Sequence, residues 1–332
     1  MKLAIVILNW NGKVLLEKFL PSLIKYSLNH DIYVVDNAST DSSVKFLESN
    51  YPNINCIKFS QNLGFAAGYN ESLKQINADL YCLLNSDVEV TKNWLHPIID
   101  IFQNEGNTHI IQPKVLDYNK KNYFEYAGAG GGFIDKLGYP YCRGRIFDSI
   151  EKDKGQYNDR TEIFWASGAC FFISATCYKN LGGFDNTFFA HMEEIDLCWR
   201  AKNKGYKIEY IGNSTVFHVG GASLDYSNPK KTYLNFRNSL FTLVKNTQYQ
   251  LIIVVYLRLL LDGLAGIKFL FQGRSNHTFA IIKAHMSFYQ ALPRLIKFRI
   301  QTNKTSKPKN ILSSIVWSHF VIKIKKFNNL HK

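Results

Sequence analysis

Acidic side chains are almost absent from the last third of the chain. Residues 1–225 carry 22 lysines and arginines against 25 aspartates and glutamates, whereas residues 226–332 carry 18 against one. Two regions with different partners are therefore expected, 1–225 and 226–332. A strongly basic region can meet nucleic acid or an anionic membrane, because the electrostatic attraction is similar for both. The sequence contains no nucleic-acid-binding motif, so we expect no nucleic-acid partner.

Long uncharged apolar runs are absent as well. The most apolar stretch, 250–271, is interrupted by Arg258, Asp262 and Lys268, and crossing a bilayer takes roughly 18–20 uninterrupted residues. We therefore expect residues 226–332 to be a helical region lying in the interface of an anionic membrane, peripheral on the inner face of the cell membrane. The alternative is an ordinary subdomain of two or three helices packed on a sheet, with lysines on its outer face.

Paired cysteines are also absent. The six cysteines contain no Cys-x-x-Cys spacing, and several lie inside apolar runs, which favours buried free thiols in a reducing compartment. The apolar run at the N-terminus is brief and no small-residue cleavage site follows it, so we expect a strand there rather than a signal peptide. These features predict a cytoplasmic protein.

Strand and helix patterns alternate through the first 90 residues. Apolar runs typical of buried strands lie at 3–8, 31–35, 55–59 and 80–84. Helical spacing between them, with short loops, predicts an α/β fold with a doubly wound, mostly parallel sheet. The spacings Gly-x-Gly-x-x-Gly and Gly-Lys-Ser/Thr do not occur, which disfavours a dinucleotide-binding or P-loop protein.

Polar residues follow the ends of these strands. They are Asn9, Asp36, the loop 62–70, and Asn85 to Asp87. In open α/β sheets ligands bind at this edge, glycines let backbone approach a phosphate closely, and a carboxylate suits a hard divalent cation that carries a phosphate. The alternative for Asp87 is a helix cap, with a helix beginning near Thr91.

The pattern changes after residue 110. A strand is expected at 110–116, followed by about forty residues of little periodicity that are typical of a functional loop, and strand character returns at 164–173. Glu193, Glu194 and Asp196 then open a helix that ends near residue 205. Glu193 and Asp196 are placed to pair with Arg200 along the helix, whereas Glu194 is turned away from Glu193 and can face a ligand.

Six of these segments, in this order, resemble the family 2 glycosyltransferases of GT-A fold, and among them the bacterial rhamnosyltransferase-like branch. The resemblance covers about residues 3–245. The segments are Ile-Leu-Asn-Trp-Asn at 7–11, Val-Val-Asp-Asn-Ala-Ser-Thr-Asp at 34–41, Asn-Leu-Gly-Phe-Ala-Ala-Gly-Tyr-Asn at 62–70, Leu-Leu-Asn-Ser-Asp-Val-Glu-Val at 83–90, Gly-Gly-Phe-Asp at 182–185, and Glu-Glu-Ile-Asp-Leu-Cys-Trp-Arg at 193–200.

The resemblance implies roles for particular residues. The set expected to bind the nucleotide sugar is Asn9, Asp36, Asn62, Gly64, Asn70, Asn85 and Asp87. Asp36 is expected at the base, Asp87 and His218 at a Mg2+ or Mn2+ ion, and Glu194 as the catalytic base. His218 also has the alternative of a hydrogen-bonded structural residue. Two departures from the family pattern are neutral Asn85, where Asp is common, and Glu194, where Asp is usual.

The implied reaction is inverting, metal-dependent transfer of a sugar from a nucleoside-diphosphate sugar to a hydroxyl group. The donor candidates are dTDP-rhamnose and a UDP-sugar, and the acceptor is a glycan or lipid-linked glycan in bacterial surface polysaccharide synthesis. Acceptor contacts are expected in 127–148 and around 165–169. One alternative is a sugar nucleotidyltransferase, which residues 8–13 disfavour because they lack a glycine-rich basic run. The other is a non-catalytic, membrane-bound scaffold of the same fold.

Overall fold

The computed structural model describes residues 1–220, 228–302 and 311–330, and its centre is a nine-stranded sheet. The strands are β1 (Leu3–Asn9), β2 (Asp31–Asp36), β3 (Asn55–Lys58), β4 (Leu80–Asn85), β5 (Val88–Val90), β6 (Thr108–Asp117), β11 (Arg160–Glu162), β12 (Cys170–Ser174) and β13 (Lys207–His218). Their order is β11-β13-β6-β12-β4-β1-β2-β3, and β5 pairs with β13.

Helices cover the sheet and extend beyond it. They are α1 (Lys13–Tyr26), α2 (Ser43–Asn50), α3 (Gly64–Leu73), α4 (His96–Asn104), α5 (Ala175–Leu181), α6 (Glu193–Asn203), α7 (Pro229–Asn246), α8 (Leu251–Phe271) and α9 (Ser275–Gln301), with short turns η1 (Asn186–Phe188), η2 (Trp317–Val321) and η3 (Phe327–Asn329). Two apolar cores lie on the two faces of the sheet. In β1, Val6 belongs to one core and its neighbours Ile5 and Ile7 to the other, as alternation along a strand buried on both faces requires.

The doubly wound α/β prediction is confirmed. Strands β1 to β4 pair in parallel, with β1 between β2 and β4. The other half of the sheet is mixed, because β12 runs antiparallel to both β4 and β6 while β13 runs parallel to β6. All six cysteines are free, and five of them are buried, as expected.

Three details of the expected pattern are wrong. The segment after Asp87 forms β5, which pairs with β13, and the next helix begins only at His96, so Asp87 does not cap a helix near Thr91. The expected loop region contains a second, four-stranded sheet of β7 (Gly132–Ile134), β8 (Pro140–Cys142), β9 (Arg145–Ile146) and β10 (Ser149–Ile150). Strands of two or three residues are too short to show periodicity.

The third detail is the stretch 164–173, of which only the end, from Cys170, is a strand. Side-chain contacts fix the preceding residues in irregular conformation. The Trp165 indole donates to the carbonyl of Phe133, and the backbone N–H of Ser167 donates to Gln112.

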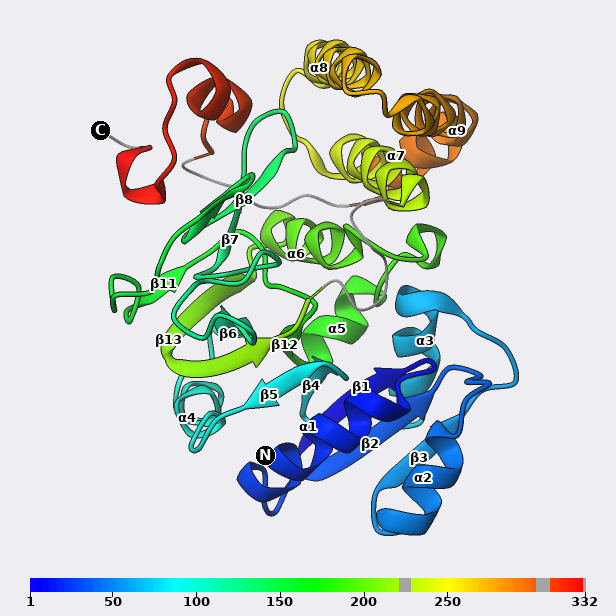
Figure 1. The fold of residues 1–332 in the computed structure, drawn as a ribbon, viewed down its shortest axis with the longest axis vertical. Helices are drawn as coiled ribbons and strands as arrows, with labels where there is room; N and C mark the ends of the chain where they lie inside the picture. The colour runs from blue at the N-terminus through cyan, green and yellow to red at the C-terminus, as the bar shows by residue number, and fades with distance from the viewer. Residues whose placement is uncertain (221–227, 303–310, 331–332) are drawn as a thin grey trace.

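The basic region packs on the rest of the protein. The expected boundary at residues 225/226 lies outside the described residues. Helix α7 contacts α6, and Leu240, Val244, Phe288 and Leu295 belong to the same apolar core as α6. Figure 1 shows α7, α8 and α9 at one end of the molecule and β3 with α2 at the opposite end. Within residues 1–220, 228–302 and 311–330, no helix is both long and apolar enough to cross a membrane.

Candidate active site

The polar residues at the strand ends lie side by side. Asn9 pairs in register with Asp36, and Asn85 with Leu8. The Asn9 amide donates to Asp36 Oδ1 and to Ser39 Oγ, at 3.2 Å each. Its own Oδ1 is buried and, within the described part of the chain, accepts no hydrogen bond. The register of the parallel strands thus brings three of the expected residues to one edge, with an unsatisfied acceptor among them.

Asn37 holds the 62–64 loop against this edge. Its amide donates to Asn62 Oδ1 at 3.0 Å, and its Oδ1 accepts from the Leu63 N–H at 2.9 Å. Gly64 has φ of +75°, and a Cβ there would lie 2.8 Å from the ring of Phe189. Only glycine fits this position, because the conformation is left-handed and the neighbouring ring is too close for a side chain.

Asn70 is occupied by protein contacts. Its amide donates to the Phe184 carbonyl at 2.8 Å, and its Oδ1 accepts from the Phe184 N–H at 2.9 Å and from the Tyr178 hydroxyl. The side chain therefore ties α3 to the Gly-Gly-Phe-Asp segment. Its direct contact with nucleotide or sugar stays a prediction.

Asp87 and His218 are in contact at the end of the sheet. Both side chains are buried, and Asp87 Oδ1 lies 3.1 Å from His218 Nε2. Burial acts to raise the pKa of Asp87, but the hydrogen bond and charge of His218 outweigh it, and the net pKa is below the ordinary value. Burial acts to lower the pKa of His218, but the charges of Glu125 and Asp87 raise it to about 10.

Glu125 lies on the other side of the imidazole. Its Oε1 is 3.5 Å from His218 Nδ1, while Asn85 Nδ2 is 3.4 Å from Nε2. A carboxylate beside each ring nitrogen keeps the imidazole protonated, and a metal ion bound at Nε2 would replace the proton there while Glu125 still faces Nδ1. Over the described residues, no group of three or more His, Cys, Asp and Glu side chains suited to a metal ion occurs.

Glu194 has the opposite environment at the start of α6. Its Oε2 is buried and, as far as the structure describes the chain, has no hydrogen-bond partner; the same is true of Glu193 Oε2. Burial raises the pKa of Glu194 to about 7, and burial together with the charge of Glu194 raises the pKa of Glu193 well above its usual range. A carboxyl group with a pKa near neutrality is suited to take up a proton at physiological pH.

The segment 167–169 lies between the end of β4, two residues before Asp87, and Glu194. The Asn85 N–H donates to the Ala169 carbonyl at 3.0 Å. A Cβ on Gly168 would lie 3.9 Å from Glu194 Cδ. Asp87 and Glu194 are therefore at the same edge of the sheet, separated by a segment in which glycine leaves space beside Glu194.

The geometry agrees with what comparison with known proteins shows. Residues 4–182, more than half of the chain, match the family model described as Glycosyl transferase family 2. The chain belongs to this family. The enzyme is a glycosyltransferase of GT-A fold, and the comparisons support a nucleotide-sugar donor.

The relatives include rhamnosyl- and hexosyltransferases. The chain is 23% identical over 219 residues to the N-acetylglucosaminyl-diphospho-decaprenol L-rhamnosyltransferase of Mycobacterium tuberculosis, covering 61% of this chain and 71% of that protein. It is 26% identical over 216 residues to a low-salt glycan biosynthesis hexosyltransferase of Haloferax volcanii, covering 63% of this chain and 65% of that protein. The rhamnosyltransferase-like resemblance is thereby supported.

Solved structures share the fold. GalNAc-T7 with UDP, GalNAc and Mn2+ has a TM-score of 0.64 at 14% identity, covering 97% of this chain and 56% of that one. The mannosyltransferase PcManGT from Pyrobaculum calidifontis, in complex with GDP-Man and Mn2+, has a TM-score of 0.53 at 11% identity, covering 87% of each chain. At these identities the likeness concerns the fold alone.

The other acids of the glycosyltransferase's α6 are structural or unpaired. Asp196 accepts from Arg200 Nε at 2.8 Å, as expected, and also from Lys245 and Asn246 of α7. Arg200 is bonded to Asp196 and to backbone carbonyls rather than to Glu193. The expected pairing is therefore confirmed for Asp196 and wrong for Glu193.

Sequence reasoning missed three residues that organise the site. They are Asn37, Glu125 and Asn238, which hold the 62–64 loop, His218 and the 188–191 loop respectively. Asn37 lies inside the segment 34–41 that carries the family resemblance, so the sequence could have marked it as a site residue. Glu125 and Asn238 act across long sequence separations, and neither stands in a recognised motif, so no sequence pattern marks them.

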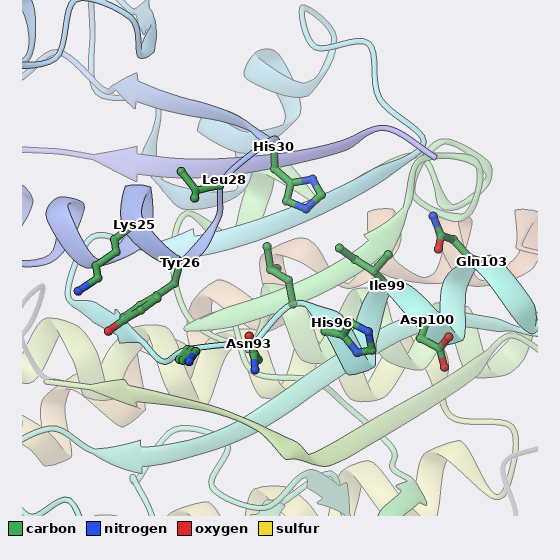
Figure 2. Close-up of a pocket in the computed structure, with 11 residues that line it drawn as sticks. Lys25, Tyr26, Leu28, His30, Asn93, His96, Ile99, Asp100 and Gln103 are labelled. Carbon is green, nitrogen blue, oxygen red and sulfur yellow. The ribbon is translucent and has the colours of Figure 1, made fainter.

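A hollow elsewhere on the glycosyltransferase contains none of the expected site residues. It has a volume of about 540 Å³ and lies between the end of α1, with Lys25 and Tyr26, and the start of α4, with His96 and Asp100 (Figure 2). The hollow lies at the edge of the sheet where the parallel strands begin, whereas Asn9 and Asn85 lie at the edge where they end. The hollow is therefore separate from the candidate active site.

Proposed function

We propose that the enzyme is an inverting, metal-dependent glycosyltransferase that moves a sugar from a nucleoside-diphosphate sugar to a hydroxyl of a glycan or lipid-linked glycan. One observation carries the proposal: two buried carboxylates share one edge of the sheet, Asp87 in contact with a histidine and Glu194 with its pKa raised to about 7. Pairs of acids whose environments separate their pKa values divide a reaction into distinct roles.

Asp87 and His218 would hold the cation. Their atoms Oδ1 and Nε2 are 3.1 Å apart, so one cation could contact both. Diphosphate oxygens and water would supply the remaining ligands. The ion, Mg2+ or Mn2+, would neutralise the charge that develops on the departing diphosphate, and two solved structures of this fold contain Mn2+.

Glu194 would act as general base on the acceptor. Its unsatisfied Oε2 can accept the hydrogen bond of an incoming hydroxyl, and its raised pKa makes it a competent proton acceptor near neutral pH. Attack from the side of Glu194, with the diphosphate leaving toward Asp87, is a direct displacement and inverts the anomeric carbon. Glu194 keeps the proton until product release.

The donor and acceptor follow from family likeness. We propose dTDP-rhamnose or a UDP-sugar as the donor and a lipid-linked glycan of bacterial surface polysaccharide synthesis as the acceptor. The support is the Mycobacterium tuberculosis relative, whose name gives rhamnosyl transfer and N-acetylglucosaminyl-diphospho-decaprenol. The reaction would take place in the cytoplasm, on the inner face of the cell membrane. Acceptor contacts would come from 127–148 and 165–169, since Gly168 borders Glu194.

The test is a screen of nucleotide sugars for hydrolysis with and without Mn2+ or Mg2+. We expect one dTDP- or UDP-sugar to be hydrolysed only when metal is present. We also expect UDP or dTDP with metal to raise the melting temperature, an effect lost in Asp87→Ala but kept in the surface control Asp100→Ala. Stabilisation by a nucleoside triphosphate alone would instead indicate a nucleotidyltransferase. Absence of hydrolysis with every donor would leave the scaffold interpretation.

A further inference from the structure

Helix α8 presents an almost uninterrupted apolar face to solvent. Its exposed apolar side chains recur at helical spacing along the whole helix, and Leu264 and Phe271 are 60% and 90% exposed. The others are Ile252, Ile253, Tyr256, Leu257, Leu260, Ile267 and Leu270. Lys268, near the end of the helix, is the one exposed charge among these 21 described residues. A contiguous apolar face of this size is typical of an interaction surface.

The two charges that interrupt the apolar sequence of α8 lie on the opposite side. Arg258 and Asp262 are both buried, at a spacing of four residues on the stripe that faces the protein. They bond to each other at 2.8 Å, Arg258 donates to the Leu137 carbonyl and to Ser239, and the Tyr139 hydroxyl donates to Asp262. This polar cluster fixes the rotation of α8 on the protein, so the apolar stripe is held facing outward.

The region that carries this face is positively charged. Asp262 is the single acidic residue of 226–332, and it is buried and paired with Arg258. The exposed charges of the described part of this region are therefore all basic; they include Lys268, Arg274, Lys283, Lys297, Lys323, Lys325 and Lys326. An apolar strip among lysines and arginines is complementary to an anionic bilayer.

A second segment extends the same surface. Lys268 Nζ lies 5.2 Å from the ring of Phe320, which places η2 beside the end of α8. In η2, Trp317 is 60% exposed and Phe320 and Val321 are exposed too, as is Ile322 directly after it. Figure 1 shows η2 and α8 at the same end of the molecule. Tryptophan next to lysine is favourable where hydrocarbon meets lipid headgroups.

We propose that the outer face of α8 together with η2, here called the docking face, lies in the surface of an anionic lipid bilayer, with α8 parallel to the membrane plane. A second copy of the chain is the less suitable occupant, because an isologous contact would bring two basic surfaces together without an acidic partner. The inference rests on the proposed function only in taking the acceptor to be lipid-linked. The docked face would hold the enzyme in the leaflet that contains its acceptor.

The experiment is vesicle co-sedimentation of the full-length protein without any sugar substrate. The vesicles are phosphatidylcholine alone, or phosphatidylcholine with about one third phosphatidylglycerol. We expect binding to the anionic vesicles that weakens as salt rises. Leu260→Asp combined with Leu264→Asp should lower the affinity at least about tenfold, because charge is placed in the apolar stripe. Leu28→Asp, at an exposed leucine outside the docking face, should leave binding unchanged.

A second set of variants separates the contribution of charge to vesicle binding from the contribution of apolar contact. Lys323→Gln with Lys325→Gln and Lys326→Gln should weaken binding to anionic vesicles several-fold. The matched triple Lys92→Gln, Lys152→Gln and Lys179→Gln, from exposed positions of the catalytic region, should not. An unchanged melting temperature and unchanged donor hydrolysis show that each variant folds, and Leu264→Gln replaces the aspartate pair if that pair does not fold.

The outcomes are distinct. If the α8 variants sediment with anionic vesicles as well as the wild-type protein does, the proposal is wrong. It is also wrong if the α8 variants convert a dimer to monomer without any change in vesicle binding, which would make the face a contact between copies. Because no sugar is present, loss of vesicle binding with intact donor hydrolysis tests this inference alone, and loss of hydrolysis with intact vesicle binding tests the proposed function alone.

Discussion

Asp87 and Glu194 both place a buried carboxylate at one edge of the sheet, but their neighbours differ and their pKa values are shifted in opposite directions. Asp87 is in contact with His218, and its pKa is lowered, so it stays ionised. Burial at the start of α6 raises the pKa of Glu194 to about 7, and among the described residues its Oε2 has no hydrogen-bond partner. The difference lies in what offsets burial: β13 places His218 beside Asp87 and its hydrogen bond and charge outweigh burial, whereas at Glu194 backbone hydrogen bonds offset burial only in part.

This contrast assigns separate tasks to the two groups. A permanently ionised carboxylate can hold a cation but cannot exchange protons near pH 7, whereas a carboxyl with a pKa of about 7 can. The helix dipole at the start of α6 favours negative charge there, yet burial outweighs it. If the contrast is correct, substitutions near Asp87 should impair metal binding, whereas substitutions near Glu194 should impair proton transfer.

Glu194→Gln should have the largest effect. The amide keeps the shape but cannot accept the proton, so we expect kcat for transfer to fall about 10²- to 10⁴-fold while donor binding stays near wild type. Steady-state kinetics with acceptor, together with calorimetry of donor binding, measures both quantities.

Glu193→Gln is the matched control for that variant, because Glu193 is one residue away and is itself a buried glutamate. It should retain most of the transfer rate, because Glu193 has no assigned proton transfer. An intact rate in Glu194→Gln, or an equal loss in both variants, would remove Glu194 as the base.

The pH dependence of transfer should come next in size. The base works only when ionised, and the pKa of Glu194 is raised from 4.5 to about 7, so activity should be constant above pH 7 and fall as pH drops through 7. The expected loss is about tenfold per pH unit, or about 10²-fold at pH 5. A kcat/KM profile from pH 4 to 9 tests this. A limb near pH 4.5 would show that Glu194 is not raised.

The strand-end half of the site was predictable from the sequence because it depends on local order. Apolar runs in β1, β2 and β4 fix where strands end, and parallel register then brings Asn9, Asp36 and Asn85 together. The same reasoning failed for β7 to β10, since strands of two or three residues carry no periodic signal.

The long-range contacts of the site were not predictable in this way. Glu125 reaches His218 across 93 positions of the chain, and Asn238 reaches the loop before Glu194 across about fifty. Such contacts depend on how the second sheet and α7 pack, which no local pattern encodes. The sequence likewise showed charges in α8 without showing that Arg258 and Asp262 face inward.

Glu125→Gln changes the surroundings of the Asp87–His218 pair, and its effect on activity should be smaller than that of Glu194→Gln or of low pH. Losing the negative charge beside Nδ1 leaves His218 less firmly oriented, and changes of this kind cost about 10- to 100-fold in metal affinity or activity. Titration of donor binding against Mn2+ should therefore shift to higher metal concentration, and saturating Mn2+ should restore much of the rate. Glu151→Gln, which contacts Tyr157, is the control. Wild-type metal dependence in Glu125→Gln would contradict the orientation of His218.

Asn238→Ala changes the support of the loop before Glu194, and of these changes it should have the smallest effect on activity. The loop before α6 is strained, because Phe189, His191 and Met192 have φ of 63°, 68° and 72°, and such conformations cost about 1–3 kcal/mol each. Asn238 offsets part of this cost, since its amide donates to three loop carbonyls at 2.8 to 3.1 Å.

Removing that amide should let the start of α6 shift by less than the 1 Å that costs about 10²-fold, so we expect kcat to fall by about tenfold or less with donor KM unchanged. The pH limb should also move, because Glu194 would gain solvent, and this readout separates a positioning role from simple destabilisation. Asn238→Asp should lose more than Asn238→Ala, since a carboxylate would face the same three carbonyls. Asn276→Ala, exposed on α9, is the control. A lower melting temperature with an unshifted pH limb would mean that Asn238 stabilises the fold without positioning Glu194.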